Sequence, residues 1–270
     1  MKYEQTHIIQ RFNIYVLLIF YILLTSCNLQ KKEFILVSKF HPFYNNIQIV
    51  DSITDNAKMA NFLQPYKDSM NLKMAKMIFH LDTILSNQYT VGNLGNKAAD
   101  FMFEAANNWL SINKASSCDF AVLNNGSIRN SLFPGDINLG NIYEAMPYDN
   151  ELVVVKLTPF QVDSLFQHIA QKNGAYLSHA TLTIDLQKPI NPKISTNKNK
   201  DFFWVAINSF MWLGGDGYQI LTKAVESYNT NILIRDILIQ EFQKEYQSTG
   251  KINPQPKSRI LLMQPINSRY

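Results

Sequence analysis

The feature that most constrains the fold is a short apolar run, residues 120–123, which ends abruptly in polar, turn-forming residues. A run this brief, bounded by turn residues, predicts a buried β-strand. Asn and Gly follow at 124–126, and both adopt left-handed backbone conformations more readily than other residues. Such a turn brings backbone N–H groups and Arg129 to a sheet edge, where ligands of α/β proteins commonly bind. An ordinary surface turn with an exposed arginine is the alternative.

Helix-like and strand-like segments are mixed along the chain without strict alternation. Apolar runs and alternation predict strands at residues 33–40, 46–50, 119–123, 151–157, 181–186, 202–207 and 259–263. Helical spacing predicts helices at residues 55–72, 97–110, 159–170 and 232–247, a short helix within 136–145, and a polar loop at 191–200. We therefore expect an α/β fold of the α+β type, with a mixed β-sheet flanked by helices.

Local signals refine two of these helices. Thr158 is the expected N-cap of the helix at 159–170, whose first residue is Pro159. Pro65 is expected to kink or split the helix at 55–72. Three methionines at helical spacing are expected to fill a core rather than to bind a soft metal: Met70, Met74 and Met77.

The N-terminus has the features of a lipoprotein signal peptide. Lys2 and Arg11 precede an apolar run at 15–24 that is too short for a stable membrane span. The run ends in Leu24-Thr25-Ser26-Cys27, which resembles the bacterial lipobox and implies cleavage before Cys27 and lipidation of its thiol. An uncleaved anchor is the alternative.

We thus expect an extracytoplasmic protein, lipid-anchored to a bacterial membrane at the outer membrane or the periplasmic face. The expected organisation is a signal peptide at 1–26, a tether at 27–32 and a single domain at 33–270.

Composition sets further bounds on the class of protein. With 46% apolar and 17% charged residues, the chain is globular, and its formal charge of +4 is too small to imply a nucleic acid polymer as partner. Of the two cysteines, Cys27 belongs to the leader, so no disulfide is expected in a processed chain. Cys118 is expected to be a small buried residue.

The chain offers little support for catalysis of its own. Four histidines follow the leader without the spacing of a helical metal site: His41, His80, His168 and His179. His168 is expected to point from its helix to solvent. There is no Gly-x-Ser-x-Gly elbow and no phosphate-binding Gly-x-x-x-x-Gly-Lys. We expect no catalytic residue, metal ligand or bound cofactor in this chain.

A binding site has more support. Tyr148 lies in a loop before the strand at 151–157, and an aromatic, glycine-rich stretch at 209–218 follows the strand at 202–207. With Arg129 at a third strand end, these aromatics could form a cleft for a planar base, where stacking contributes about 1–3 kcal/mol per base. Asp216 could accept hydrogen bonds from ligand hydroxyls. Core aromatics and a plain Asp-Gly turn are the alternatives.

Three motifs in this region occur in a recognisable order. Residues 124–129 resemble Asn-Gly-Gly-Gly-Ile-Arg, residues 135–137 with 143–150 resemble Gly-Asp-Ile…Tyr-Glu-x-x-Pro-Phe-Gly-Asn, and residues 210–218 resemble Phe-Leu-x-x-Gly-Gly-Asp-Gly-Phe. Gly92-Asn93-Leu94 fits a further Gly-Asn-Leu. Over about residues 85–225, the sequence thus resembles the C-terminal domain of the 5′-nucleotidase and UDP-sugar hydrolase family.

The resemblance implies that the domain binds the nucleoside part of a nucleotide. The stacking aromatics would be Tyr148 and Phe210, and the base-side and phosphate-side contacts would be Asn124 and Arg129. Asp216 would accept the ribose hydroxyls, within a motif that includes Gly214 and Gly215. The sequence departs from the pattern where Asn125 and Ser127 replace glycines and where Tyr148 replaces Phe. Residues 86–90, just before Gly-Asn-Leu, also lack the arginine that the family often has there.

Members of the family also carry an N-terminal metallophosphatase domain with two metal ions. Only about 60 residues separate Cys27 from the region of resemblance, too few for such a domain. We expect a nucleotide- or nucleoside-binding half that acts in nucleotide catabolism with a separate metallophosphatase chain, which would hold the divalent metals. A solitary nucleoside- or nucleotide-binding lipoprotein without a hydrolytic role is the alternative.

Overall fold

The computed structural model describes residues 56–88, 92–196, 200–254 and 258–263. They belong to one compact unit that begins at Asn56. The expected signal peptide, the tether, Cys27, and the strands at 33–40 and 46–50 lie outside the described residues. Among the described helices, none has the length and apolar character needed to span a membrane.

The helices are α2 (Ala57–Met74), α3 (Asn93–Lys114), α4 (Leu139–Ala145), α5 (Pro159–Gln171), α6 (Ser209–Trp212) and α7 (Ile234–Thr249), with short 3₁₀ turns η1 (Asn125–Ser127), η2 (Gly215–Gly217) and η3 (Leu221–Lys223). The strands are β1 (Met77–Leu81), β2 (Phe120–Leu123), β3 (Gly135–Asn138), β4 (Glu151–Leu157), β5 (Tyr176–Ser178), β6 (Ala180–Asp185), β7 (Lys188–Ile194), β8 (Phe203–Asn208), β9 (Glu226–Leu233) and β10 (Ile260–Leu262).

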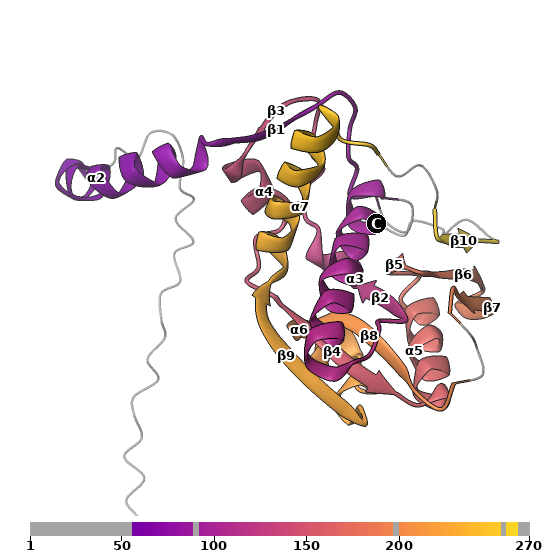
Figure 1. Ribbon diagram of the computed structural model, residues 1–270. Helices are drawn as coiled ribbons and strands as arrows, with labels where there is room; N and C mark the ends of the chain where they lie inside the picture. The colour runs from indigo at the N-terminus through magenta and orange to yellow at the C-terminus, as the bar shows by residue number, and fades with distance from the viewer. Residues whose placement is uncertain (1–55, 89–91, 197–199, 255–257, 264–270) are drawn as a thin grey trace, which may run out of the picture. The chain divides into compact units, whose positions relative to one another are not determined.

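A five-stranded sheet in the order β5-β2-β8-β4-β9 forms the centre of the fold (Figure 1). β2 and β8 run parallel, whereas the other neighbouring pairs are antiparallel. Smaller sheets pair β1 with β3 and order β10-β6-β7. The expected α+β fold with a mixed, helix-flanked sheet is therefore confirmed.

β2, β4 and β8 are apolar along most of their length because both faces of the central sheet are covered. Along β4, Leu152 and Val154 pack into one core with residues of α3 and α7, while Val153 and Val155 pack into a second core with residues of α5. β2 and β8 divide their side chains between the same two cores. Side chains alternate along a strand, so each strand contributes to both layers.

The expected cap of α5 is present. The Thr158 hydroxyl accepts from the Gln161 backbone N–H, and the Gln161 side chain accepts from the Thr158 backbone N–H. This reciprocal pair satisfies two helix-terminal donors. Cys118 is buried as expected, and burial raises the pKa of its thiol.

Two expectations were wrong, and one alternative of a third was excluded. Residues 188–194, which overlap the expected polar loop at 191–200, form β7. This strand pairs only with β6 among the described strands, so its polar residues and two prolines are tolerated at the open edge. Met70 and Met77 do not fill a core: they are 54% and 48% exposed, and Met77 belongs to β1. Pro65 does not split the helix, since α2 continues through it, and none of the residues of α2 is buried.

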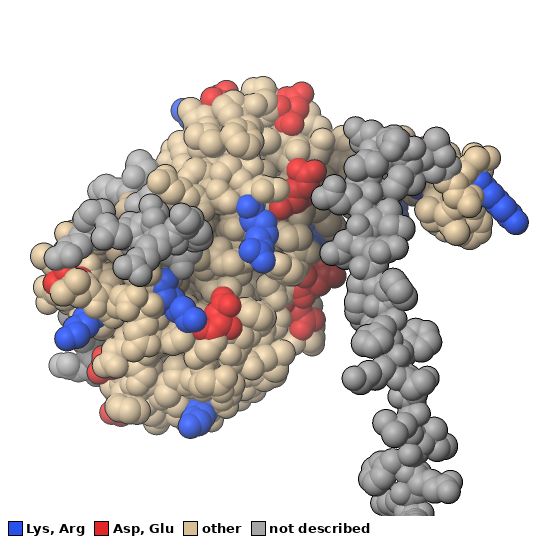
Figure 2. All heavy atoms as spheres, turned by 180° about the vertical axis from the view of Figure 1, so that it is seen from behind, with Lys and Arg blue, Asp and Glu red and all other residues tan. Residues whose placement is uncertain are grey.

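Charged side chains do not segregate on the face drawn in Figure 2. Lys and Arg lie among Asp and Glu of the described residues there. Several of the charged side chains in the fold are paired, including Lys156 with Glu226 and Lys200 with Asp119.

Candidate functional site

Three strand ends converge on one edge of the central sheet. β2 and β8 are parallel, so Asn124 and Asn208 lie at neighbouring C-terminal ends. β4 is antiparallel to β8 and pairs Leu152 with Asn208, which brings the loop before β4 to the same edge. The topology thus brings the motif at 210–218 to the two motifs within residues 124–150, from which it is far apart in the chain.

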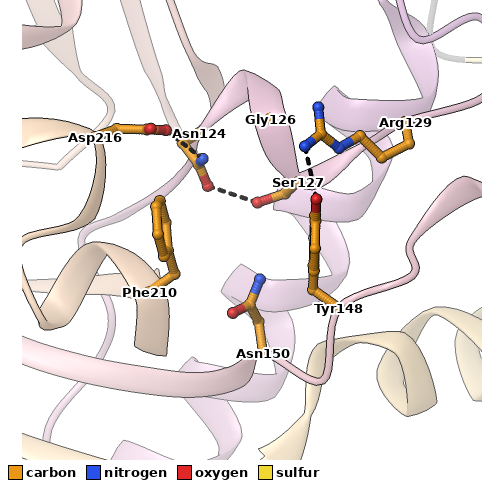
Figure 3. A pocket seen from close by; sticks show the side chains of 8 residues that line it. All are labelled: Asn124, Gly126, Ser127, Arg129, Tyr148, Asn150, Phe210 and Asp216. Atoms are coloured by element: carbon orange, nitrogen blue, oxygen red, sulfur yellow. Dashed lines mark hydrogen bonds between the residues drawn. The ribbon is translucent and has the colours of Figure 1, made fainter. Parts of the chain in front are cut away.

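A cavity of about 260 Å³ lies at this edge (Figure 3). The residues that line it are Asn124, Gly126, Ser127, Arg129, Tyr148, Asn150, Phe210 and Asp216. All five non-glycine residues expected at the binding site are therefore brought together. Gly214 and Gly215 are not among the lining residues.

Two aromatic side chains form opposite walls of the cavity. Phe210, on α6, and Tyr148, in the loop before β4, face each other across it (Figure 3). They are 42% and 45% exposed, so neither ring is committed to a core. The space between them suits a flat ring that could stack on both.

Gly215 explains where the Phe210 ring lies. A Cβ atom on Gly215 would be 2.5 Å from ring carbons of Phe210, far inside contact distance. Gly214 has φ +83°, a conformation that favours glycine. Gly215 therefore acts behind Phe210 without lining the cavity, whereas Gly214 shapes the turn and lies close to Gln219 and Thr222.

A buried polar network fixes the inner end of the cavity. The Asn124 Oδ1 atom accepts from Ser127 Oγ (2.5 Å) and from Asn208 Nδ2 (2.8 Å), while its Nδ2 donates to Asp216 Oδ2 (2.7 Å). Asn124, Ser127 and Asn208 are each at most 5% exposed. Asn124, which was expected as a base-side contact, lines the cavity, and its side-chain amide also donates to Asp216.

Asp216 is held from two sides. Its backbone has φ +52°, a strained conformation for a residue with a side chain. The His168 Nε2–H donates to the Asp216 carbonyl oxygen over 3.1 Å, and the His168 ring packs edge-on against Tyr218. The expectation that His168 points to solvent was therefore wrong, because α5 packs beside the glycine-rich turn. Partial burial lowers the pKa of His168.

Arg129 and Tyr148 are linked directly. Arg129 Nη2 donates to the Tyr148 hydroxyl over 2.6 Å, and the guanidinium carbon lies 5.3 Å from the centre of the ring. The hydroxyl that distinguishes Tyr148 from phenylalanine thus anchors the cationic residue expected at the site. A guanidinium in this place can receive an anionic group of a ligand.

Sequence reasoning missed the roles of three residues of the site. Asn208 caps α6 through the Met211 N–H and also holds Asn124 and Ser127. Its signal is a polar residue that ends an apolar strand immediately before a helix start. Asn150 lines the cavity from the end of the Tyr148 loop. Ser127 replaces a glycine of the family pattern, but its hydroxyl joins the network.

The described residues contain no group of three or more His, Cys, Asp or Glu side chains arranged to hold a metal ion. They therefore do not fit the dimetal centre that the family resemblance implies for a metallophosphatase domain. The cavity offers aromatic faces, amides, a carboxylate and a guanidinium, which are binding groups.

Comparison with known proteins is consistent with this geometry. A family model described as "5′-nucleotidase, C-terminal domain" matches residues 75–223. The trifunctional nucleotide phosphoesterase protein YfkN of Bacillus subtilis is 25% identical over 79% of this chain and 16% of its own length. Protein UshA of Yersinia enterocolitica is 29% identical over 51% of this chain and 28% of its own.

A solved structure supports the fold. The 5′-nucleotidase precursor of Thermus thermophilus superimposes with a TM-score of 0.64 at 23% identity, over 76% of this chain and 43% of that one. The chain thus spans less than half the length of each of these similar proteins.

Proposed function

Because the chain belongs to the 5′-nucleotidase C-terminal domain family, we propose that it is the nucleotide- or nucleoside-binding half of a 5′-nucleotidase-type phosphohydrolase. The single observation that carries this proposal is the cavity between Phe210 and Tyr148, with Asp216 and Arg129 at its margins. A base stacks between the two rings, which would contribute about 1–3 kcal/mol.

The polar groups of the cavity indicate where the ribose and the phosphate would bind. Asp216 accepts the ribose hydroxyls, because a carboxylate keeps a second acceptor oxygen when Oδ2 is engaged by Asn124. Arg129 receives the phosphate, since its guanidinium is fixed at the cavity wall by Tyr148. The domain thereby holds the nucleotide in one orientation. Such positioning accelerates hydrolysis when it presents the phosphate to the catalytic groups of another domain or chain.

We further propose that hydrolysis is performed by a separate metallophosphatase chain, which supplies the divalent metals. The cavity supports this division, because it offers aromatic faces, amides, a carboxylate and a guanidinium, which are binding groups. Divalent metals in such a partner would polarise the phosphate and activate water.

The test is reconstitution. The purified full chain, a purified metallophosphatase lacking this domain, and their mixture are each assayed for phosphate release from AMP with added Mn²⁺ or Mg²⁺. We expect rapid release from the mixture alone. Full activity of this chain by itself would contradict the division of labour. Binding of AMP without any gain of activity in the mixture would favour a solitary nucleotide-binding protein.

Membrane anchoring through Cys27 belongs to the same proposal. The lipobox-like Leu24-Thr25-Ser26-Cys27 supports it. Mass spectrometry of the mature protein is expected to find an N-terminal cysteine that carries acyl chains, and Cys27→Ala should release the protein from the membrane fraction. An unmodified Cys27 in a membrane-free protein would contradict the anchor.

A further inference from the structure

The loop that carries Tyr148, residues 146–150, is tied at both ends to the start of α7. Arg235 Nη1 donates to the Met146 carbonyl oxygen over 3.0 Å, and Arg235 Nη2 pairs with the Asp149 carboxylate. Next to it, the Ile234 N–H donates to the Asn150 carbonyl oxygen over 2.9 Å. The contacts of α7 thus bracket Tyr148 on both sides along the chain.

The Arg235 guanidinium depends on this loop for its polar partners. Its side chain is 5% exposed, and its guanidinium carbon lies 3.8 Å from the centre of the Tyr143 ring. Within the described part of the chain, Nε has no hydrogen-bond partner, and the guanidinium donates to the Met146 carbonyl and the Asp149 carboxylate through its Nη atoms. Moving the loop would leave a buried charge without these acceptors, which is strongly unfavourable.

The loop also makes a hydrogen bond on its exposed side. Arg129 donates to the Tyr148 hydroxyl over 2.6 Å. Both polar groups that the loop uses, the hydroxyl of Tyr148 and the carboxylate of Asp149, stand where the family pattern has Phe and Gly. The Arg129–Tyr148 hydrogen bond and the Arg235–Asp149 ion pair therefore use residues that depart from that pattern. Both interactions restrain the loop that carries the Tyr148 ring.

We propose that Arg235 and Asp149 are positioning residues, which hold Tyr148 in its stacking orientation before a ligand arrives. This inference rests on the proposed nucleoside binding. If Tyr148 is already ordered, binding does not carry the entropic cost of ordering it. Affinity should therefore fall when the Arg235–Asp149 ion pair is removed. Neither residue lines the cavity, so their effect on the ligand is indirect, and we expect it to pass through Tyr148.

Asp149→Ala is the informative variant. The Asp149 side chain is 72% exposed, so its removal leaves no void, although the buried Arg235 guanidinium then keeps only the Met146 carbonyl as acceptor. Arg235→Met alters a buried site and serves as the second variant. Glu226→Ala is the matched control, since it breaks the Lys156–Glu226 pair on β4 and β9 away from the cavity. Each variant is made in the full chain, alone and together with Tyr148→Ala, and adenosine affinity is measured by calorimetry.

We expect Asp149→Ala to weaken adenosine binding about 3- to 10-fold, Asp149→Asn to retain most of the affinity because its amide oxygen still accepts from Arg235, and Glu226→Ala to match the wild type. In the Tyr148→Ala background, Asp149→Ala should have no further effect, since Asp149 acts through Tyr148. A general loss of stability would instead lower affinity equally in both backgrounds.

The outcomes separate the two claims. Wild-type protein that binds neither adenosine nor AMP overturns the proposed function and this inference with it. Wild-type protein that binds, while Asp149→Ala and Arg235→Met bind equally well, overturns the inference alone. An equal loss in Glu226→Ala, or the same loss of affinity with and without Tyr148, also overturns it.

Discussion

At the scale of single residues, Gly215 leaves the space in which the Phe210 ring lies. A methyl group there would approach ring carbons to 2.5 Å, so Gly215→Ala should displace the ring. We expect adenosine affinity, measured by calorimetry, to fall by about 5- to 150-fold, as for loss of the stacking itself. In a Phe210→Ala background the same glycine substitution should change nothing, and a further loss there would contradict this role of Gly215.

His168 gives a pH dependence whose sign follows from its environment. Partial burial lowers the pKa of His168 from its ordinary value of 6.5, so the unfolded chain binds the proton first as pH falls. The neutral ring therefore contributes stability that is present above pH 6.5 and is lost as pH falls from there through the lowered pKa.

Urea unfolding at about pH 7 and about pH 5 tests this sign. The wild type should lose more free energy of unfolding between these pH values than His168→Gln, which keeps a side-chain N–H donor for the Asp216 carbonyl but does not titrate. Identical losses in the two proteins would show that His168 does not couple protonation to folding.

At the scale of elements, α2 is a helix that buries none of its residues. Its exposed apolar side chains include Phe62 and Tyr66, at 64% and 67%. Packing against the domain therefore contributes little to its stability. A chain that begins at residue 75 should have the same melting temperature as one that begins at residue 56. A decrease of more than about 4 °C, equivalent to about 1 kcal/mol or more, would contradict this.

The sequence predicted the elements whose pattern is local and strong. The buried strand at 151–157 and the capped helix from Pro159 match β4 and α5 closely. The strands it missed are at sheet edges or very short: β9 is polar along most of its length, and β5 has three residues. β9 needs no apolar run because it lies at an edge of the sheet, and β5 is too short for periodicity to detect.

The same contrast holds at the site. The motifs carrying Tyr148, Phe210 and Asp216 could be recognised in the sequence, and the structure brings them together. The role of Asn208 and the contact of His168 with the Asp216 loop depend on which strand ends and helices meet in space. No pattern within one segment contains that information.

At the scale of the whole molecule, the domain builds its pocket from three sequence motifs that meet at one sheet edge. The chain spans less than half of the similar phosphoesterase, UshA and 5′-nucleotidase chains described above. Its proposed contribution is to hold base, ribose and phosphate, while the metals act on a partner.

Calorimetric titration of AMP into the full-length wild type and into Phe210→Ala tests the proposed nucleoside site most directly. We expect saturable binding at one site in the wild type, and an affinity about 5- to 150-fold weaker in Phe210→Ala, from the loss of one stacking face. Absence of binding by the wild type, or equal affinity of the two proteins, would contradict a nucleoside site between Phe210 and Tyr148.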